Sequence, residues 1–407
     1  MEEIQVPPYF ICPISLEMMK DPVTISTGIT YDRENIERWI FSARNNTCPV
    51  TKQSLTSIEL TPNVTLRRFI QSWCTLNASH GIERFPTPKP PVSKAQILKL
   101  MKEAKSGEMQ MKSLKTLRSI ASVNDANKRC MESAGAAEFL ASVVIDSSDA
   151  LDEEGFTSTK DEALSILYQL KLSEDGLRSL IASGNGEFIE SLTRVMQRGS
   201  YESRAYAVML MKDMFEASTL PALFSSLKKE FFAQVVRVLR DEISQKATKA
   251  SLQALAHACP FGRNRVKAAE AGAVRVLVDL LLDSSEKRTC ELMLILLDQI
   301  CQSAEGRAEL LNHPGGLAIV SKKILRVSKV GSERAIKILH SISKFSSTQS
   351  VVQEMLSLGV VAKLCLVLQV ECGSKAKDRA RDILKIHAKP WRNSPCIPMN
   401  LLSSYPF

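Results

Sequence analysis

The chain has 407 residues, of which 44% are hydrophobic and 24% are charged, and these fractions exclude a disordered or fibrous protein. Aromatic residues make up only 6%, which suits helices packed through aliphatic side chains better than a β-sandwich. Lys and Arg outnumber Asp and Glu by 53 to 44, a formal charge of +9, and the simplest interpretation of so small an excess is a solvated surface.

The ten cysteines indicate a cellular compartment. They are scattered through a long chain whose first residues, MEEIQVPPYF, are acidic and lack the apolar segment of a secretory signal. We therefore expect reduced thiols and a location in the cytoplasm or the nucleus. The longest apolar runs, such as 292–297, are far shorter than the roughly 18 residues that a membrane span requires, so we expect no such span.

Charge and proline content divide the chain into four parts. Residues 1–76 carry 7 basic and 8 acidic side chains, whereas the remainder carries 46 basic and 36 acidic ones. Between them the segment FPTPKPPV places four prolines within six residues, which favours an extended, semi-rigid linker. The predicted parts are an N-terminal domain at 1–76, a linker at 77–91, a helical region at 92–389 and a Pro-rich tail at 390–407.

The helical region is repetitive. Leu, Ile, Val and Ala recur there at helical spacing, and apolar pairs that close similar helices begin 52, 43, 42, 44 and 43 residues apart. The pairs are Val143-Val144, Val195-Met196, Val238-Leu239, Leu280-Leu281, Ile324-Leu325 and Val367-Leu368. Intervals of this size predict an α-solenoid of armadillo or HEAT type, with about six to seven repeats and a long concave binding surface. A polar insertion at 151–159, LDEEGFTST, accounts for the longest interval.

Glycines mark the turns of this region. Gly135, Gly272, Gly316 and Gly359 precede four of the repeated helices, and we expect them to supply a positive φ.

The N-terminal domain cannot be a zinc module. Residues 1–76 contain Cys12, Cys48 and Cys74 as their only thiols, without a C-x-x-C pair, and the first histidine is His80. Three such ligands cannot complete a tetrahedral site, so we expect no metal and no cofactor. Hydrogen bonds and ion pairs must then hold the loops, and the plausible members are Glu17, Asp21, Asp32, Arg33 and Lys52.

Local patterns predict the elements of this domain. A strand begins within 19–23, and Gly28 provides the positive φ of the following hairpin turn. Asp32 is placed to cap a helix over 33–41, in which Ile36 and Ile40 share one face. A last helix is predicted around 66–73.

Three segments, FICPISLEMMKDPVTISTGITYDRENIERWI, TCPVTKQSL and TPNVTLRRFIQSW, strongly resemble the U-box domain of ubiquitin ligases. Its coupling to armadillo-type repeats is similar to the plant U-box–armadillo family. The resemblance implies a mostly α protein in which a small α+β, zinc-free, RING-like U-box precedes an armadillo α-solenoid. It also implies an E3 ubiquitin ligase without a covalent intermediate. In such a ligase the U-box docks a ubiquitin-conjugating enzyme (E2) charged with ubiquitin, and the array binds a protein substrate.

The resemblance also assigns residues. The E2 contacts would be Ile14 of the first loop, Trp39 of the central helix, Pro49 of the second loop and Lys52 on the rim. The scaffold of the U-box would comprise Cys12, Pro13, Gly28, Tyr31, Asp32, Ile36 and Cys48. Alternatives remain open, since Cys12 suits a buried small side chain, Pro49 could merely shape its loop, and Trp39 and Ile14 could belong to the core. The family often acts in plant stress and immune signalling.

Other functions fit the sequence less well. A ligase with a catalytic thiol is disfavoured because Cys259, Cys290, Cys301, Cys365 and Cys372 occupy apolar helical positions. The basic pairs lack the interleaved aromatics of nucleic-acid binders, so no nucleic-acid partner is expected. Nuclear-import recognition is disfavoured because neither Trp nor Asn recurs at the positions where importin-α repeats present them. An armadillo adaptor without ligase turnover remains the alternative function.

Substrate would contact the third helix of each repeat, as in the armadillo proteins that the array resembles. The candidates for the floor of that groove are Gln169, His257, Gln299, Lys337 and Ser341. Alternatively, these are ordinary solvated positions, and substrate binds at an edge or at the insertion 151–159.

Overall fold

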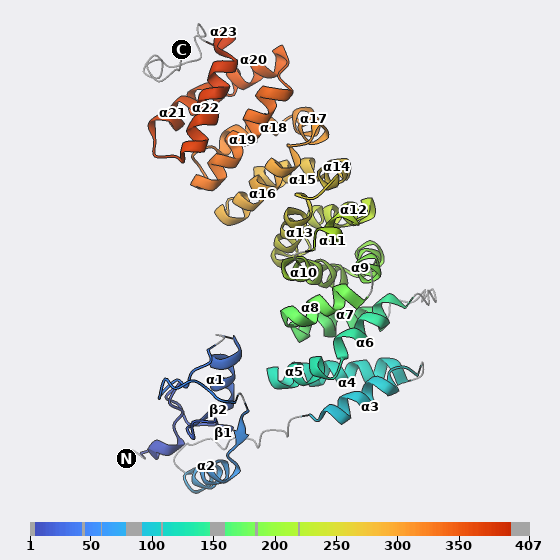
Figure 1. The fold of residues 1–407 in the computed structure, drawn as a ribbon, viewed down its shortest axis with the longest axis vertical. Coiled ribbons are helices and arrows are strands. Elements are labelled where there is room, and N and C mark those ends of the chain that lie inside the picture. Colours follow the sequence, from blue (N-terminus) through green and yellow to red (C-terminus); the bar gives the residue numbers. More distant parts are fainter. Residues whose placement is uncertain are drawn as a thin grey trace. The chain divides into compact units, whose positions relative to one another are not determined.

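The computed structural model describes residues 5–42, 45–57, 59–78, 92–106, 109–146, 159–183, 186–218 and 220–391. The chain divides into two compact units, Met1–Pro91 and Val92–Phe407 (Figure 1). Almost all of the predicted linker, insertion and tail lies outside the described residues.

The first unit contains a small antiparallel sheet with two helices. The strands β1 (Pro22–Thr24), β2 (Thr30–Asp32) and β3 (Thr61–Pro62) are ordered β2-β1-β3. Val23 is paired with Tyr31 on one side and with Pro62 on the other. The turn between β1 and β2 places Gly28 at φ +81°, a conformation that costs glycine little because it has no Cβ.

The helices of this unit agree with the predicted positions. A 3-10 turn, η1 (Pro8–Phe10), precedes the sheet. The central helix α1 (Arg33–Glu37) continues into a π-helical turn, η2 (Arg38–Ser42), and α2 (Val64–Leu76) is longer than the predicted 66–73. Asn63 caps α2, since its side chain accepts a hydrogen bond of 3.0 Å from the Leu66 N–H.

The capping role predicted for Asp32 is wrong. Asp32 occupies the N-cap position of α1, but its side chain makes no capping hydrogen bond. Its carboxylate instead accepts the backbone N–H groups of Lys20 and Asp21, both at 2.8 Å. The register explains this, because Asp32 is paired with Pro22 and so lies beside the segment that leads into β1.

Two buried thiols are held by β2. The Tyr31 hydroxyl lies 3.1 Å from Cys48 Sγ, and the Asp32 N–H donates to Cys12 Sγ at 3.3 Å. Cys12, Tyr31 and Cys48 have no exposed surface. Consecutive residues of one strand therefore fix the two loops that contain these cysteines.

Ion pairs add to this anchoring. Asp21 accepts a hydrogen bond of 2.6 Å from Arg33 Nε, at the start of α1, and lies 3.6 Å from Arg67 Nη1 of α2. Of the five residues predicted to hold the loops, Asp21, Asp32 and Arg33 thus act through their side chains. Glu17 contributes its backbone carbonyl, which accepts the Cys12 N–H at 2.8 Å.

The second unit is a regular stack of helices (Figure 1). Its helices are α3 (Lys94–Glu103), α4 (Gln110–Val123), α5 (Asp125–Ser133), α6 (Ala136–Ile145), α7 (Thr159–Leu170), α8 (Glu174–Ser183), α9 (Glu187–Arg198), α10 (Tyr201–Ala217), α11 (Pro221–Ser225), α12 (Lys229–Arg240), α13 (Gln245–Ala258), α14 (Asn264–Glu270), α15 (Ala273–Asp283), α16 (Lys287–Ile300), α17 (Ala304–Asn312), α18 (Gly316–Lys323), α19 (Lys329–Phe345), α20 (Gln349–Ser357), α21 (Val360–Gln369), α22 (Ser374–Ile386) and α23 (Ala388–Trp391). Every third helix from α4 to α22 packs against the next one. This is the ladder of third helices that the repeat spacing predicts.

One continuous hydrophobic core runs through this stack. It extends from Ile97 of α3 to Trp391 of α23, and both side chains are fully buried. No single helix among the described residues is long and apolar enough to span a membrane, and α20 with α21 reaches that length only as a pair bent by 65°.

The glycines predicted to precede four of the repeated helices act in two ways. Gly272 has φ +80° before α15, as predicted. Gly316 lacks a positive φ, and its role lies in close packing, because a Cβ there would lie 2.0 Å from the Leu310 carbonyl oxygen.

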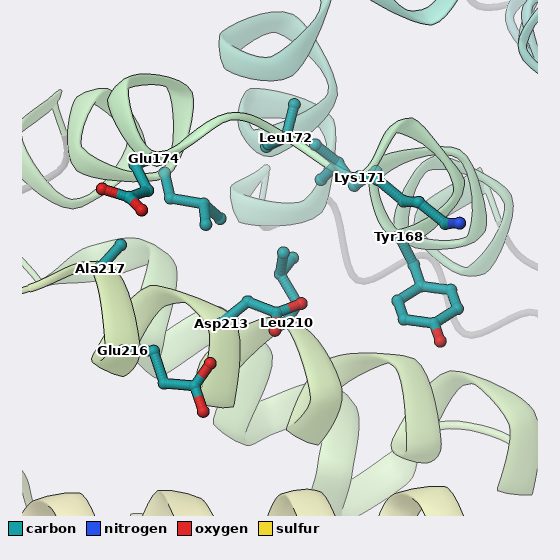
Figure 2. Close-up of a pocket in the computed structure, with 10 residues that line it drawn as sticks. Tyr168, Lys171, Leu172, Glu174, Leu210, Asp213, Glu216 and Ala217 are labelled. Carbon is teal, nitrogen blue, oxygen red and sulfur yellow. The ribbon is translucent and has the colours of Figure 1, made fainter. Parts of the chain in front are cut away.

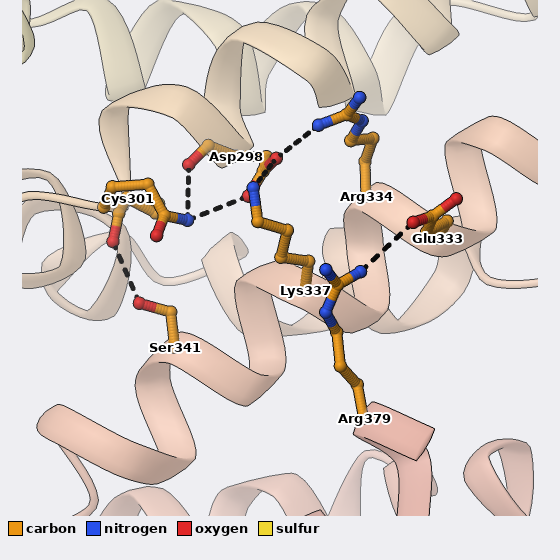
Figure 3. A network of polar contacts seen from close by, with 8 residues as sticks. Asp298, Cys301, Glu333, Arg334, Lys337, Ser341 and Arg379 are labelled. Carbon is orange, nitrogen blue, oxygen red and sulfur yellow. Dashed lines mark hydrogen bonds and ion pairs between the residues drawn. The ribbon is translucent and has the colours of Figure 1, made fainter. Parts of the chain in front are cut away.

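A buried carboxylate links two neighbouring third helices. Asp298 of α16 has no exposed surface, and its Oδ2 lies 2.9 Å from Arg334 Nη1 and 2.8 Å from Lys337 Nζ of α19. Gln302 donates to Oδ1 at 2.9 Å. The ladder continues to α22 through Glu333 and Arg379, 3.2 Å apart (Figure 3). Except for the local hydrogen bond from Gln302, each of these contacts joins one repeat to the next.

We predict that Asp298→Ala lowers the free energy of unfolding by about 2 kcal/mol, because Arg334 and Lys337 lose a buried partner but can rehydrate in part. Urea denaturation and amide exchange in α16 and α19 measure the loss. Asp382→Ala is the matched control, since this carboxylate is 61% exposed and 3.6 Å from His340, and it should change stability by less than about 0.5 kcal/mol. Equal losses in the two variants would contradict the prediction.

We also predict that the first unit folds without zinc, because its two loops are held by hydrogen bonds to the thiols of Cys12 and Cys48. Among the described residues no group of three His, Cys, Asp or Glu side chains could hold a metal. Elemental analysis of the purified protein should find no stoichiometric zinc, and EDTA should leave the melting temperature unchanged. A fall in the melting temperature that added zinc reverses would refute this prediction.

Candidate functional site

Two loops of the first unit share one structure. Residues 11–18 read ICPISLEM and residues 47–54 read TCPVTKQS. The Cys12 N–H donates to the Glu17 carbonyl at 2.8 Å, and the Cys48 N–H donates to the Gln53 carbonyl at the same distance. Each loop begins and ends in an isolated bridge, Ile11 to Met18 and Thr47 to Ser54.

The two loops also share a strained position. Leu16 has φ +58° and Lys52 has φ +60°, and both follow the cysteine by four residues. For residues with a Cβ this conformation costs on the order of 1–2 kcal/mol, so the surrounding hydrogen bonds must hold it. The N–H groups of Leu16 and Lys52 donate to the Cys12 and Cys48 carbonyls at 2.9 and 3.0 Å.

Trp39 is fixed against the second loop. Its indole N–H donates to the Thr47 carbonyl at 2.7 Å, and the Lys52 ammonium lies 5.6 Å from the centre of its ring. The side chain is half-buried against the core of the unit. The structure thus brings Trp39, Lys52 and the start of the second loop together, and leaves part of the indole accessible.

The remaining predicted contacts lie in the loops themselves. Ile14 and Pro49 are half-buried. Two exposed loop residues were not predicted from the sequence, Leu16 at 76% and Val50 at 51% exposure. An alignment of residues 11–18 with residues 47–54 would have identified both as candidates, because Leu16 is equivalent to Lys52 and Val50 is equivalent to Ile14.

We call Ile14, Leu16, Trp39, Pro49, Val50 and Lys52 the two-loop surface.

Most of the other scaffold residues are buried. Cys12, Tyr31, Ile36 and Cys48 have no exposed surface, whereas Pro13 is exposed. The Cys48 sulfur receives hydrogen bonds from Thr27 Oγ1 at 3.5 Å and the Thr51 N–H at 3.4 Å, besides its contact with Tyr31.

These contacts shift the pKa values of the thiol and the phenol. Burial raises the pKa of Cys48, but the hydrogen bonds from Thr27, Thr51 and Tyr31 together outweigh it and bring the pKa to about 6. Burial and the contact with Cys48 raise the pKa of Tyr31 far above its ordinary value. The Tyr31 hydroxyl therefore stays protonated and can donate to a Cys48 thiolate at neutral pH.

The groove candidates in the array differ in accessibility. Gln169, His257 and Gln299 are half-buried on α7, α13 and α16. The Oε1 atoms of Gln169 and Gln299 are buried and have no hydrogen-bond partner among the described residues. Two neutral acceptors at equivalent places in two repeats are thus left without a protein partner.

The prediction for Ser341 is wrong, and that for Lys337 needs a correction. Ser341 is 5% exposed, and its hydroxyl donates to the Cys301 carbonyl of the preceding repeat at 3.1 Å. Its place on α19 faces the packed interface, so no ligand can reach its hydroxyl. Lys337 is bound to Asp298 and is therefore not a free cation (Figure 3).

A hollow of about 430 Å³ lies between the end of α7, the start of α8 and α10 (Figure 2). Tyr168, Lys171, Glu174, Asp213 and Glu216 contribute to its lining. Lys212 lies between two of its carboxylates, 2.9 Å from Asp213 and 2.7 Å from Glu216, and Arg178 lies 3.4 Å from the third, Glu174. With Lys171, three cations therefore face three carboxylates. With its charges balanced in this way, the hollow has no strong preference for a cation or an anion.

Comparison with known proteins identifies both units. The U-box domain family matches residues 6–79, and the plant U-box protein ARM repeat region matches residues 95–407. The E3 ubiquitin-protein ligases PUB22 and PUB23 of Arabidopsis thaliana are 52% and 54% identical to this chain. Each alignment covers 100% of this chain, with 99% of PUB22 and 98% of PUB23.

A solved structure supports the fold of the array. A chain from a study of the interaction between cadherin and β-catenin superposes with a TM-score of 0.58 at 12% identity, over 79% of this chain and 57% of the other. At that identity the likeness concerns the fold alone. The two matched families and the extent of the similarity to PUB22 and PUB23 show that this chain belongs to the plant U-box–armadillo proteins and is a U-box-type E3 ubiquitin-protein ligase.

Proposed function

We propose that the two-loop surface recruits an E2 charged with ubiquitin, while the concave side of the array holds the protein to be modified. The observation that carries this proposal is the fixed position of Trp39, whose indole is tied to Thr47. The exposed side chains of Leu16 and Val50 lie on two loops that are held by equivalent backbone hydrogen bonds. Exposed apolar side chains on rigid loops lose little entropy on binding, which is typical of an interaction hot spot.

Ubiquitin transfer in this proposal needs no thiol of the ligase. Each described cysteine is buried or half-buried. Burial raises the pKa of Cys259 to about 12, and it also raises the pKa of Cys301, so neither is a ready nucleophile. Cys48 has a low pKa but no exposed surface. A substrate lysine would attack the E2 thioester directly, and the ligase would contribute proximity and orientation.

Two unpartnered acceptors favour the groove as the substrate site. The side chains of Gln169 and Gln299 are half-buried, and a rotation of each amide would let its Oε1, which lacks a partner among the described residues, accept a backbone N–H of an extended peptide. The imidazole of His257 lies on α13, between the helices that carry them. The other location considered, the insertion at 151–159, lies outside the described residues except for Thr159.

The family also suggests the biological process and the cellular location of this protein. We propose action in plant stress or immune signalling, and a cytoplasmic or nuclear location, from the family resemblance and the reduced cysteines. Membership of an E3 ligase family favours turnover over the alternative of an adaptor without ligase activity.

We predict that Trp39→Ala and Leu16→Ala abolish most self-ubiquitination, since each removes an apolar anchor worth on the order of 2–4 kcal/mol of E2 affinity. Ile14→Ala should act in the same direction, and Pro49→Ala more weakly because the loop keeps most of its hydrogen bonds. Chain formation with a panel of E2 enzymes and E2 affinity by calorimetry measure the effect. Leu220→Ala is the matched control, because Leu220 is 58% exposed but lies in the array. Normal chain formation by Trp39→Ala with every E2 would exclude Trp39 as a contact.

For the groove, we predict that the triple change of Gln169, His257 and Gln299 to Ala weakens substrate capture about tenfold, or about 1.4 kcal/mol. Self-ubiquitination should persist, because the two-loop surface is untouched. The partner most enriched by proximity labelling with the full chain serves as substrate, and its affinity is measured by calorimetry. The control changes exposed Gln245 and Gln349 to Ala. Unchanged affinity in the triple variant would place the substrate site elsewhere.

A further inference from the structure

Positive charge is concentrated in the C-terminal half of the array. Residues 92–245 contain 20 basic and 22 acidic side chains, whereas residues 246–391 contain 23 basic and 13 acidic ones. The modest charge of the whole chain therefore conceals a strongly basic half. A partner that meets this half would gain from carrying negative charge.

Within this half, a hollow of about 240 Å³ is surrounded by cations. It lies between the loop from α15 to α16, the start of α16 and the end of α18. Its polar lining consists of Ser284, Ser285, Lys287, Lys322, Lys323 and Arg326. None of the described residues that line it is acidic or aromatic.

Three of these cations have no partner among the residues that the structure describes. Within the described part of the chain, no hydrogen bond or ion pair reaches the side chains of Lys287, Lys322 or Arg326, and all three are exposed. Lys323 differs, since its Nζ donates to the Ser284 carbonyl at 3.0 Å and lies 3.3 Å from Cys290 Sγ. Lys323 thus fixes one wall, and the other three cations remain available to a ligand.

Two carboxylates near these cations in sequence are engaged locally, and a third, Asp283, lines a different hollow. Glu286 accepts a hydrogen bond from Thr289 Oγ1 at 2.5 Å, and Glu291 accepts one from the Ser328 hydroxyl. The charge of Arg326 also reaches Lys363, because the pKa of Lys363 is lowered by burial and, to a smaller extent, by that charge.

Several other cations of the array are paired. Lys228 lies 2.6 Å from Glu190, Lys229 lies 2.7 Å from Glu270, and Arg204 lies 2.5 Å from Asp241. Like charges held around one hollow repel each other, and a bound anion would remove that cost. The cluster therefore differs from the solvated ion pairs elsewhere on the surface.

We propose that this hollow binds a phosphorylated side chain of a protein partner. A phosphoryl group carries nearly two negative charges and several acceptor oxygens, which suits three free cations and two serine hydroxyls better than a single carboxylate does. The lining offers no ring on which a nucleobase could stack, so a nucleotide fits poorly. The partner is taken to be a protein because the proposal rests on the protein-holding role proposed for the array.

The test uses the full chain and a fluorescent alanine pentapeptide whose central residue is phosphoserine, glutamate or serine. Fluorescence anisotropy should show binding of the phosphoserine peptide about tenfold tighter than that of the serine peptide, with the glutamate peptide between them. The variant Lys322→Ala with Arg326→Ala should lose about tenfold in affinity for the phosphoserine peptide. The control Lys112→Ala with Arg263→Ala removes the same charge at exposed positions elsewhere and should keep it.

Three results would overturn the proposal. They are equal affinity for the serine and phosphoserine peptides, an equal loss in the control variant, and an effect of the hollow variant only on binding to phosphatidylserine vesicles, which would make a membrane the occupant. Melting temperatures check that both variants are folded, and Lys322→Gln with Arg326→Gln replaces the alanine variant if it is not. Self-ubiquitination is measured in parallel. If the unmodified protein ubiquitinates itself but does not bind the phosphoserine peptide, this inference alone is refuted. If the unmodified protein does not ubiquitinate itself, the proposed function is refuted.

Discussion

Strand β2 is the constraint on which the U-box surface depends. Tyr31 reaches the Cys48 thiol with its side chain, and Asp32 reaches the Cys12 thiol with its backbone N–H. These two thiols occupy equivalent places in two loops that contain all the residues proposed to contact the E2 except Trp39. Because β2 is paired to β1 in a fixed register, both loops are positioned by one short strand. The Asp32 carboxylate then ties the preceding segment to the same strand through Lys20 and Asp21.

In the array, a hydrophobic core and polar contacts between repeats position the helices. Its helices are joined by one continuous hydrophobic core, which gives cohesion but little directional information. Polar contacts between successive third helices supply that direction, as between Asp298 and Arg334 or between Ser341 and the Cys301 carbonyl. A buried carboxylate with two cationic partners has few alternative arrangements, so we infer that such contacts set the register of neighbouring repeats. They also engage Lys337 and Ser341, so that Gln169, His257 and Gln299 remain from the five residues predicted to contact substrate.

Much of this protein was predictable from short patterns. The spacing of apolar pairs near 43 residues predicted the ladder of helices, and glycine positions such as Gly272 marked its turns. The three U-box segments predicted the N-terminal fold, and the absence of a C-x-x-C pair predicted the hydrogen bonds and ion pairs of Asp21, Asp32 and Arg33. Asp32 shows the limit of such patterns. A carboxylate directly before a helix commonly caps that helix. Because β2 is paired with β1, however, the Asp32 carboxylate accepts hydrogen bonds from the backbone N–H groups of Lys20 and Asp21 instead.

The sequence by itself determined the order of the domains, the helical repeats and the identity of the two cysteine loops, because these follow from local periodicity and from motifs that are contiguous in the chain. Only the tertiary structure decided which polar residues are free. Ser341 and Lys337 have the same local pattern as accessible helix residues, and their partners come from the preceding repeat, about 40 residues away. Lys322 and Arg326 are likewise ordinary surface residues in sequence. They become a site only because the packing of α18 beside the start of α16 places Lys287 and two serines around the same hollow, and such convergence depends on the stacking of repeats.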